Sequence, residues 1–374
     1  MINDVREDFT GITFSGFKKT IVRRELLLCI YNKKIENSCY WVGELICAGH
    51  YSEVWDILIE YMMRFVHTGN PKLPIYIYMR FNRFLEILHN GYADKVLNMR
   101  NNEQVRNIFC ECVCLLCYSR KKHRIESVKI GRHEFDLTNL STRLKSPSTE
   151  YATAILKPDD PKELFIPINE LGYSLQTKNS VECCYWIEWI IEYETICKKR
   201  KVKLATERRT FTHLNLDATS ANTNTNTNTN TNTNTTNGKI EIPDKNQKDC
   251  IWIVWEMIVE YSRHVNNILI AKIVRSLLGL FLIRYTEGVK RRRRHLLYFA
   301  ISICLDPINL STDIIDGDKT REEIAAILSK IGRIFAQIKK NEHAPKTDYL
   351  FNGLDNRSNL DKTIERLNIM YNDV

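Results

Sequence analysis

Four cysteines lie close together in the sequence CECVCLLC, at residues 110–117. Clustered thiols can hold a zinc ion, carry out redox chemistry or pack in a core. On a helix, Cys110, Cys114 and Cys117 would share one face, whereas Cys112 would not. A structural zinc ion needs four ligands that converge, and one straight helix spreads its side chains along its length. We therefore predict core thiols and expect neither a metal ion nor another cofactor.

Signature sequences of common catalytic sites do not occur in the chain. It contains no GxxxxGK[ST], HExxH, GxSxG or GxGxxG sequence, and its nine histidines are scattered. Those signatures would indicate a phosphate-binding loop, a catalytic zinc site, a nucleophilic serine and a dinucleotide site. Their absence favours a protein that is not an enzyme. An enzyme with an unfamiliar site stays open as an alternative.

Positive charge is concentrated in three stretches of a chain whose formal net charge is +9. Residues 198–209 read KKRKVKLATERR, residues 120–132 read RKKHRIESVKIGR, and residues 290–294 read KRRRR. A surface that binds a polyanion needs such concentrated charge. For residues 290–294, a solvated or ion-paired surface, a nuclear-localisation-like patch and phosphate contacts all stay open. The candidate nucleic-acid contacts are Lys198, Lys199, Arg200, Lys201, Lys290, Arg291, Arg292, Arg293 and Arg294.

Cysteine usage and the length of the apolar runs bear on the cellular compartment. Twelve cysteines and an N-terminus without an apolar leader predict a reducing compartment. Residues 251–259 and 296–305 are the strongest apolar runs, and both are shorter than the roughly 18 residues of a membrane span. We therefore expect buried helices there and no membrane partner.

Apolar residues recur at helical spacing through most of the sequence. This pattern predicts a first helical unit over residues 1–125 and a second over residues 176–310. Residues 126–175 contain several prolines and some stretches of alternating character. They predict an irregular, loop-rich connector with at most a short hairpin.

The second unit is interrupted by a low-complexity tract. Residues 222–237 read NTNTNTNTNTNTNTTN, and a repeat of small polar side chains cannot bury a core. We predict a disordered segment over about residues 215–247. A neutral expansion of a surface loop would explain the tract, because such loops tolerate insertion.

The last part of the chain, residues 311–374, is predicted to form an amphipathic helix and a tail. Thr320 and Glu323 fit a capping box at the start of that helix. Apolar residues follow at spacings of three and four as far as Ile338, which gives one apolar face. We predict that this face packs in the core, with docking to a partner helix as the alternative.

A short sequence occurs twice. SCYWVGELI at residues 38–46 resembles CCYWIEWII at residues 183–191, 145 residues further along. Each copy would begin the central helix of one helical unit, with its aromatic side chains packed inward. The predicted core aromatics of the repeat are Tyr40, Trp41, Tyr185 and Trp186.

The first unit has a wider resemblance. Residues 23–71 carry Tyr40, Trp41, Gly49, Gly69 and Pro71 at places comparable to those in the helical collar of clamp-loader-type ATPases. The replication-associated recombination protein A family is the most similar of these. The sequence has no counterpart of that family's ATPase domain. The resemblance therefore implies assembly of subunits, and it does not imply nucleotide hydrolysis.

The whole chain also resembles an uncharacterised protein family of giant, mimivirus-like nucleocytoplasmic large DNA viruses. The sequences that carry this resemblance are SCYWVGELICAGHY, GNPKLPIYIYMRF, LFIPINELGYS and CYWIEWIIEYE. The resemblance implies expression in the host cytoplasm, in a viral factory or in the virion, with the nucleus as a further location. It implies no activity.

Together these observations predict a mainly α-helical protein: two helical-bundle units of collar-like character joined by a loop-rich connector. We expect a non-enzymatic interaction or scaffold protein of a large DNA virus, acting in a replication or assembly complex with protein partners or with itself. The alternative is a nucleic-acid-binding protein that uses its basic clusters on DNA or RNA without reading sequence. An enzyme is the second alternative.

Overall fold

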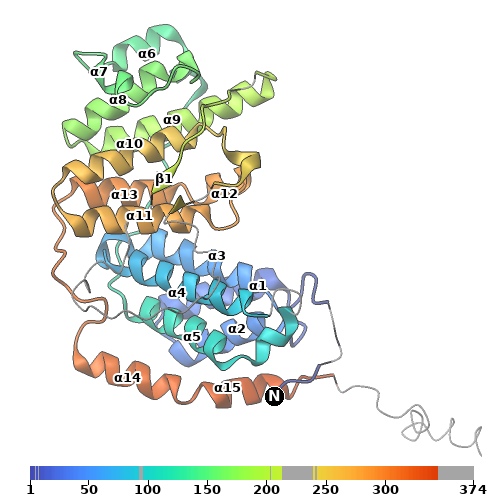
Figure 1. Cartoon of the computed structure of the whole chain (residues 1–374). Coiled ribbons are helices and arrows are strands. Elements are labelled where there is room, and N and C mark those ends of the chain that lie inside the picture. The colour runs from blue at the N-terminus through green and yellow to red at the C-terminus, as the bar shows by residue number, and fades with distance from the viewer. Residues whose placement is uncertain are drawn as a thin grey trace, which may run out of the picture.

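The computed structural model describes residues 1–343, apart from residues 5, 7, 92–95, 203, 213–238 and 241. The chain is mainly helical, as predicted, and its helices are stacked from α6–α8 at one end to α14 and α15 at the other (Figure 1). The α-helices and strands are α1 (Lys19–Tyr31), α2 (Ile35–Cys47), α3 (Tyr51–Tyr61), α4 (Leu73–His89), α5 (Glu103–Tyr118), α6 (Leu137–Arg143), α7 (Glu150–Thr153), α8 (Phe165–Gln176), α9 (Ser180–Lys199), β1 (Phe211–Thr212), β2 (Lys239–Ile240), α10 (Ile251–His264), α11 (Ile268–Leu282), α12 (Glu287–Arg292), α13 (His295–Leu305), α14 (Asp318–Leu328) and α15 (Ile331–Lys339). Short helical turns are η1 (Met62–Val66), η2 (His67–Gly69), η3 (Val96–Asn101), η4 (Arg132–Phe135), η5 (Lys162–Leu164) and η6 (Asp244–Asn246).

Polar side chains fix the starts of several helices. Asn102 accepts a hydrogen bond from the backbone N–H of Val105 at the start of α5, and Asn179 does the same for Glu182 at the start of α9. Thr286 caps α12 in this way. Each cap satisfies a backbone donor that has no partner within its helix. The starts of α9 and α12, which form the site described below, are therefore set locally.

Helices α1, α3 and α4 pack around the pair formed by α2 and α5. Helix α2 lies against α1 on one side and α5 on the other, and α15 covers α2. Gly43 in α2 permits this cover, because a Cβ atom there would lie 2.6 Å from Ile338 Cδ1 of α15. The apolar C-terminal face therefore packs in the core, as predicted. The predicted single helix is in fact two, since α14 ends at Leu328 and α15 begins at Ile331.

The apolar core is continuous through the molecule. Helix α4 packs against α11, and buried side chains from residues 1–125 and 176–310 belong to one cluster. Gly279 in α11 allows the two helices to approach, because a Cβ atom there would lie 2.3 Å from Tyr78 Cε2 of α4. The division into two units stays a prediction.

The prediction of an irregular connector over residues 126–175 is wrong from residue 137 onward. Helices α6, α7 and α8 lie there, and no strand occurs in this range, all of which the structure describes. Helix α8 packs on α9 and contributes Leu171 and Leu175 to the core. Pro167 does not break α8, because it lies in the first turn, where a backbone N–H has no helical partner.

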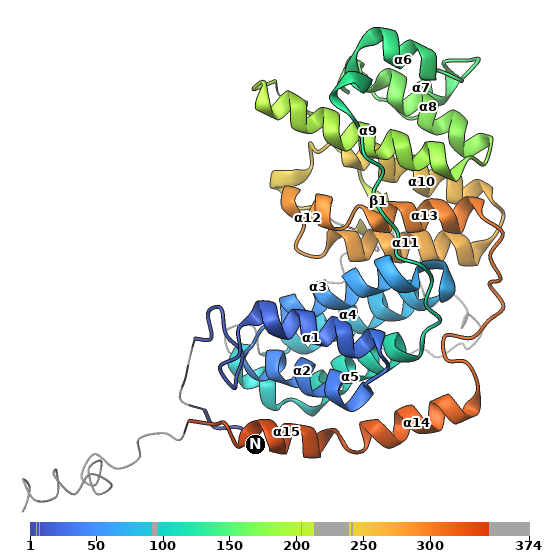
Figure 2. The same cartoon turned by 180° about the vertical axis from the view of Figure 1, so that it is seen from behind.

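Only the start of that range, residues 126–131, is extended. Residues 120–131, which we call the strap, leave α5 and run over α13 and α9 towards α6 (Figure 2). The backbone N–H of Lys122 donates to the carbonyl oxygen of Phe65 at 2.7 Å, and that of Val128 donates to the Tyr298 hydroxyl at 3.2 Å. Gly69 lets the strap pass, because a Cβ atom there would lie 2.1 Å from the Arg120 carbonyl oxygen.

Strands β1 and β2 pair antiparallel on either side of the low-complexity tract, with Phe211 opposite Ile240. The tract itself, residues 222–237, lies outside the described residues. The predicted disordered segment extends too far, because residues 242–247 include the turn η6 and the buried side chain of Ile242.

Candidate anion-binding face

The cysteine cluster forms part of the core. Cys110, Cys112, Cys114 and Cys117 are all buried on α5, and each is a free thiol. Burial raises the pKa of Cys117 to about 12 and also raises that of Cys112. These two thiols are therefore protonated at neutral pH, whereas metal binding and redox attack need the thiolate. Across the described residues, no group of three or more His, Cys, Asp or Glu side chains is placed to hold a metal ion.

Residues 290–294 do not form one surface. Lys290 is only 3% exposed, and its ammonium group forms ion pairs with Glu194 and, at 2.8 Å, with Asp249. Arg293 is 4% exposed and pairs with Asp56 at 2.6 Å. Arg293 also donates to three main-chain carbonyls at the end of α11. The prediction of phosphate contacts is therefore wrong for Lys290 and Arg293, because both are buried and each pairs with a carboxylate distant in sequence.

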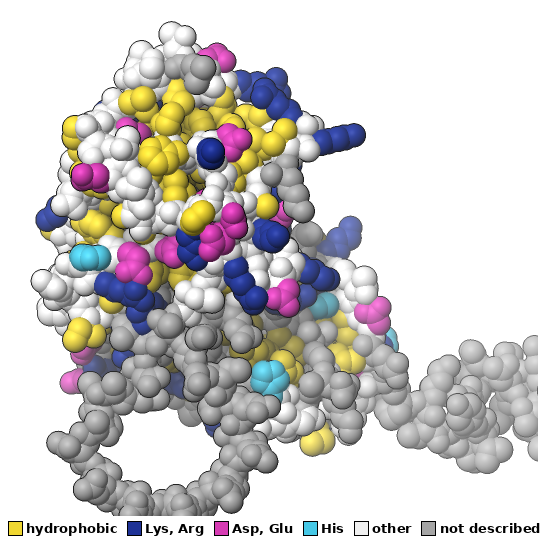
Figure 3. Space-filling view, turned by 45° about the horizontal axis from the view of Figure 1, so that its top comes forward, with side chains coloured by type: hydrophobic (Ala, Val, Ile, Leu, Met, Phe, Trp, Pro, Cys, Tyr) yellow, Lys and Arg dark blue, Asp and Glu magenta, His cyan; other side chains and the backbone are white. Residues whose placement is uncertain are grey.

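Other predicted contacts are exposed, on elements that touch each other. Lys199, Arg200 and Lys201 follow one another where α9 ends, and Arg291 and Arg292 lie on α12. Lysine and arginine side chains gather along the right-hand edge in Figure 3, the edge where α9 and α12 end in Figure 1.

Side-chain contacts hold α12 beside the last turns of α9. Lys198 pairs with Glu194 of its own helix at 2.7 Å and with Glu287 of α12 at 2.9 Å. Arg291 donates a hydrogen bond to the hydroxyl of Thr195. Lys198 therefore ties the two helices together, and its charge is balanced within the protein.

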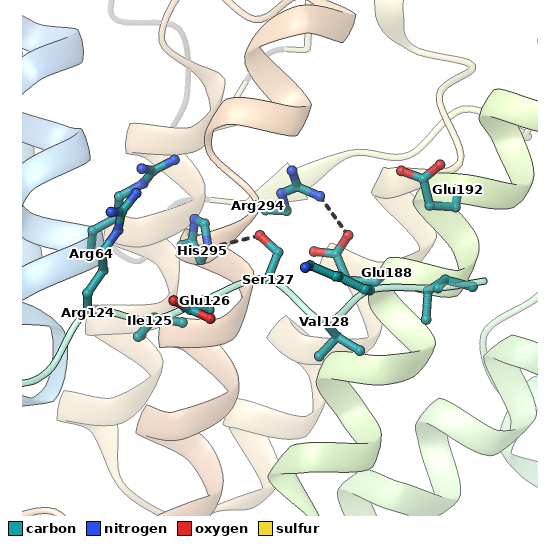
Figure 4. A pocket seen from close by; sticks show the side chains of 12 residues that line it. Arg64, Arg124, Ile125, Glu126, Ser127, Val128, Glu188, Glu192, Arg294 and His295 are labelled. Carbon is teal, nitrogen blue, oxygen red and sulfur yellow. Dashed lines mark hydrogen bonds and ion pairs between the residues drawn. The ribbon is translucent and has the colours of Figure 1, made fainter.

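The basic cluster of residues 120–132 forms the strap. A pocket of about 660 Å³ lies beneath it. Its walls come from the strap, α9, α13 and η1. Figure 4 shows Arg64 and Arg124 at one end and Glu188 and Glu192 at the other, with Arg294 between them. We call these the cationic end and the acidic end. The pocket therefore brings members of two basic clusters together with residues that the sequence did not single out.

The cationic end contains a histidine that stays neutral. His295 is 3% exposed, and its Nε2 lies 3.2 Å from Ser127 Oγ. Burial and the charges of Arg64, Arg294 and Arg124 lower the pKa of His295 to about 4. Burial is also the main cause that lowers the pKa of Arg64, with Arg124 and Arg294 adding to it. Three guanidinium groups therefore create a positive potential around an uncharged imidazole.

The acidic end is partly neutralised from within. Glu188 is 1% exposed and accepts hydrogen bonds from the Tyr298 hydroxyl at 2.7 Å and from Arg294 at 2.9 Å. Burial raises the pKa of Glu188 despite these donors. Glu192 lies one turn further along α9, and Arg291 is 4.0 Å away.

The Ser127–His295 pair does not form a hydrolytic site. A serine nucleophile needs a histidine base that an acidic group orients through the other ring nitrogen. In the described part of the chain, Nδ1 of His295 has no hydrogen-bond partner. A histidine with a pKa of about 4 is also a weak base at neutral pH. The pair is better suited to binding than to catalysis.

The repeated aromatics differ in burial. Tyr185 and Trp186 of α9 are 4% and 1% exposed, as predicted. Tyr40 and Trp41 of α2 are only half-buried, and Trp41 lies edge-on to the exposed Phe17. The inward packing is therefore confirmed for the second copy and incomplete for the first.

Comparison of the chain with protein families, curated proteins and solved structures gives no match. Within the described residues, none of the helices combines the length and apolar character that crossing a membrane requires. The face formed by the strap, α9 and α12 is therefore the feature of the molecule from which we infer a function.

Proposed function

We propose that the protein is a helical scaffold that binds the phosphate backbone of nucleic acid on the face formed by α9, α12 and the strap. The observation that carries this proposal is the adjacency of exposed cations from different basic clusters. Lys199, Arg200 and Lys201 directly follow the part of α9 that contacts α12 through Lys198–Glu287 and Thr195–Arg291. None of Lys199, Arg200, Lys201 and Arg292 has an ion pair within the described structure. Unpaired surface cations are free to neutralise phosphates and to release their counterions.

Binding of this kind has a defined dependence on salt. The logarithm of affinity for duplex DNA falls with the logarithm of salt concentration, with a slope of about −0.9 for each phosphate contacted. Flexible lysine and arginine side chains on phosphates carry no sequence information directly. We therefore expect similar affinities for unrelated sequences of the same length.

The test is a charge-neutralising variant with a matched control. The α9 variant combines Lys199→Gln, Arg200→Gln and Lys201→Gln, which removes three positive charges from the end of α9. The control replaces the exposed Lys330, Lys339 and Lys340 with Gln, near α14 and α15 at the other end of the stack (Figure 1).

Fluorescence anisotropy with labelled DNA at several salt concentrations provides the readout. The α9 variant should reduce the magnitude of the salt slope by about 2–3, and the control should leave it unchanged. Both variants should melt like the parent protein, since they alter exposed side chains. Absence of binding at low salt, or equal effects of the two variants, would remove nucleic acid from the account.

A second candidate function, self-association, has its own structural support. The exposed fractions of Phe17, Ile21, Leu28 and Tyr31 are 41%, 42%, 47% and 51%, and Ile21 and Leu28 lie two turns apart on α1. Apolar side chains at such spacing are typical of paired helices. We propose that α1 contacts a second copy, in keeping with the assembly that the collar resemblance implies.

Molar mass measured by light scattering across a range of concentrations tests this candidate. The double variant Ile21→Glu and Leu28→Glu should be monomeric at concentrations where the parent protein is dimeric. Ile268→Glu is the control, because Ile268 is an apolar residue that is 82% exposed on a different helix. A monomeric parent protein at every concentration would exclude the candidate.

On the sequence resemblance alone, we further propose that these interactions serve a replication or assembly complex of a large DNA virus, in the host cytoplasm or the virion. Identification of the proteins and nucleic acids that co-purify with the chain from infected cells tests this part. Recovery of the chain alone, free of viral protein and of nucleic acid, would contradict it.

A further inference from the structure

The cationic end of the strap pocket has hydrogen-bond donors without acceptors. Arg64 Nε and Arg294 Nε are buried, and neither has a partner among the residues that the structure describes. Arg124 lines the same pocket from the strap and forms no ion pair there within the described chain. The two Nε atoms are closed off from the pocket, and both side chains also pair with carboxylates, Arg64 with Glu60 at 3.4 Å and Arg294 with Glu188 at 2.9 Å. Arg124 is therefore the guanidinium group of this end that is free to take an acceptor from a ligand.

Ser127 adds a neutral donor at the same place. Nδ1 of His295 is buried without a partner in the described part of the chain. A buried N–H without an acceptor is rarer than an acceptor that lacks a donor, so we assign the proton of this neutral ring to Nε2. Nε2–H then donates to Ser127 Oγ at 3.2 Å. The hydroxyl hydrogen of Ser127 is left free to donate into the pocket.

The floor of the pocket is closed by buried side chains. His295 and Glu188 are 3% and 1% exposed, and they line the pocket from α13 and α9. A ligand that enters beneath the strap can therefore reach the cationic end only with one of its own ends. An internal phosphodiester would need room for a chain on both sides and carries only one negative charge.

We propose that the cationic end binds a phosphate monoester, whose terminal oxygens accept hydrogen bonds from Arg124 and Ser127. Guanidinium groups suit such an anion because they form charge-assisted, geometrically matched hydrogen bonds with phosphate. In a nucleic-acid complex, the monoester is the terminal phosphate of a strand, and this part rests on the proposed function. A free nucleoside monophosphate offers the same chemistry.

The acidic end then faces the nucleoside. Base amino groups and sugar hydroxyls are donors, and Glu192 is a half-buried carboxylate placed to accept from them. Lys199 lies seven residues beyond Glu192 on the same helix, which corresponds to about 10 Å along its axis. The next phosphates of a strand would therefore reach the exposed cations at the end of α9.

The experiment compares oligonucleotides that differ only in their ends. Single strands of one sequence carry a 5′-phosphate, a 3′-phosphate or hydroxyls at both ends, and anisotropy gives their affinities. Either the 5′-phosphorylated or the 3′-phosphorylated strand should bind about tenfold more tightly than the hydroxyl strand, as expected for a few charge-assisted hydrogen bonds. Arg124 also belongs to the strap of the proposed binding face, so Arg124→Gln should weaken the binding of all three strands and in addition remove the advantage of the phosphorylated one.

Two further variants give the matched controls. Arg132→Gln removes an exposed charge just beyond the strap, outside the pocket, and should preserve the advantage. Glu126→Gln removes an exposed carboxylate from the pocket wall and should increase the advantage. Arg124 and Glu126 are both exposed, so neither variant should affect folding.

The outcomes separate the two proposals. Equal affinity for all three strands would overturn the monoester site and leave the proposed function intact. If no strand binds, the proposed function fails, and a thermal-shift assay with a nucleoside monophosphate decides the monoester site. Stabilisation by the monophosphate but not by the nucleoside, lost in Arg124→Gln, would support the site with a small ligand as its source. Equal effects of the two compounds would overturn it.

Discussion

Lys290 and Arg293 are close neighbours of Arg291 and Arg292 in sequence, yet the two pairs have opposite surroundings. Lys290 and Arg293 are buried and paired with carboxylates, whereas Arg291 and Arg292 are exposed on α12. Carboxylates from distant parts of the chain make this difference, since Asp56 lies 237 positions from Arg293. A run of basic residues therefore overstates the charge that a nucleic acid can reach.

Replacement of the buried Lys290 should have the largest effect on stability. Lys290→Met would leave Glu194 and Asp249 in the core without their shared cation. Breaking a buried ion pair in this way costs about 3–5 kcal/mol. Urea unfolding should show that loss, whereas Arg292→Met should change the free energy of unfolding by less than about 0.5 kcal/mol. A similar loss of unfolding free energy in the two variants would contradict the distinction between buried and exposed cations.

The second-largest expected effect is a pH dependence of stability that His295 causes. In the fold the pKa of His295 is about 4, below its ordinary value of 6.5. Below pH 6.5 the unfolded chain therefore binds a proton that the folded chain does not, and stability falls as the pH falls from 6.5 to 4. The contribution is about 2–3 kcal/mol.

His295→Asn should reduce the pH dependence of stability over this window, as measured by unfolding at pH 7, 6, 5 and 4. Carboxylate titration contributes to both proteins, so the difference between their two curves isolates the histidine. Parallel curves would show that burial and the three arginines do not hold this imidazole neutral.

The smallest effect is expected at the low-complexity tract. Strands β1 and β2 pair on either side of it, so deletion of residues 222–237 shortens the connection between elements that remain in contact. Loop-closure entropy changes by less than about 1 kcal/mol when a loop shortens by half. Melting temperature should change by a few degrees at most, and a larger decrease would indicate that the tract packs on the fold.

The sequence was sufficient where periodicity decides structure. The Cys110–Cys117 helix, the apolar runs of α10 and α13 and the apolar face of α14 and α15 all follow from residues near one another in the chain. Helices α6, α7 and α8 were missed because two are very short and the third contains Pro167. In a first turn, proline is compatible with a helix.

The pocket could not be predicted, because it is formed by tertiary contacts alone. Arg64, Ser127, Glu188 and His295 come from four separate elements, and no local spacing relates them. Only the basic character of the strap and of residues 290–294 pointed to this region. The same limit explains why the burial of Lys290 was not foreseen.

The central claim is that adjacent arginines have separate functions, and one paired measurement tests it. Arg292→Gln and Arg293→Gln remove the same charge from neighbouring positions, and both variants are melted and titrated with duplex DNA at several salt concentrations. We expect Arg292→Gln to flatten the salt slope without changing the melting temperature. Arg293→Gln should lower the melting temperature and leave the slope of the folded protein unchanged. The reverse assignment, or the same change in both variants, would contradict the account.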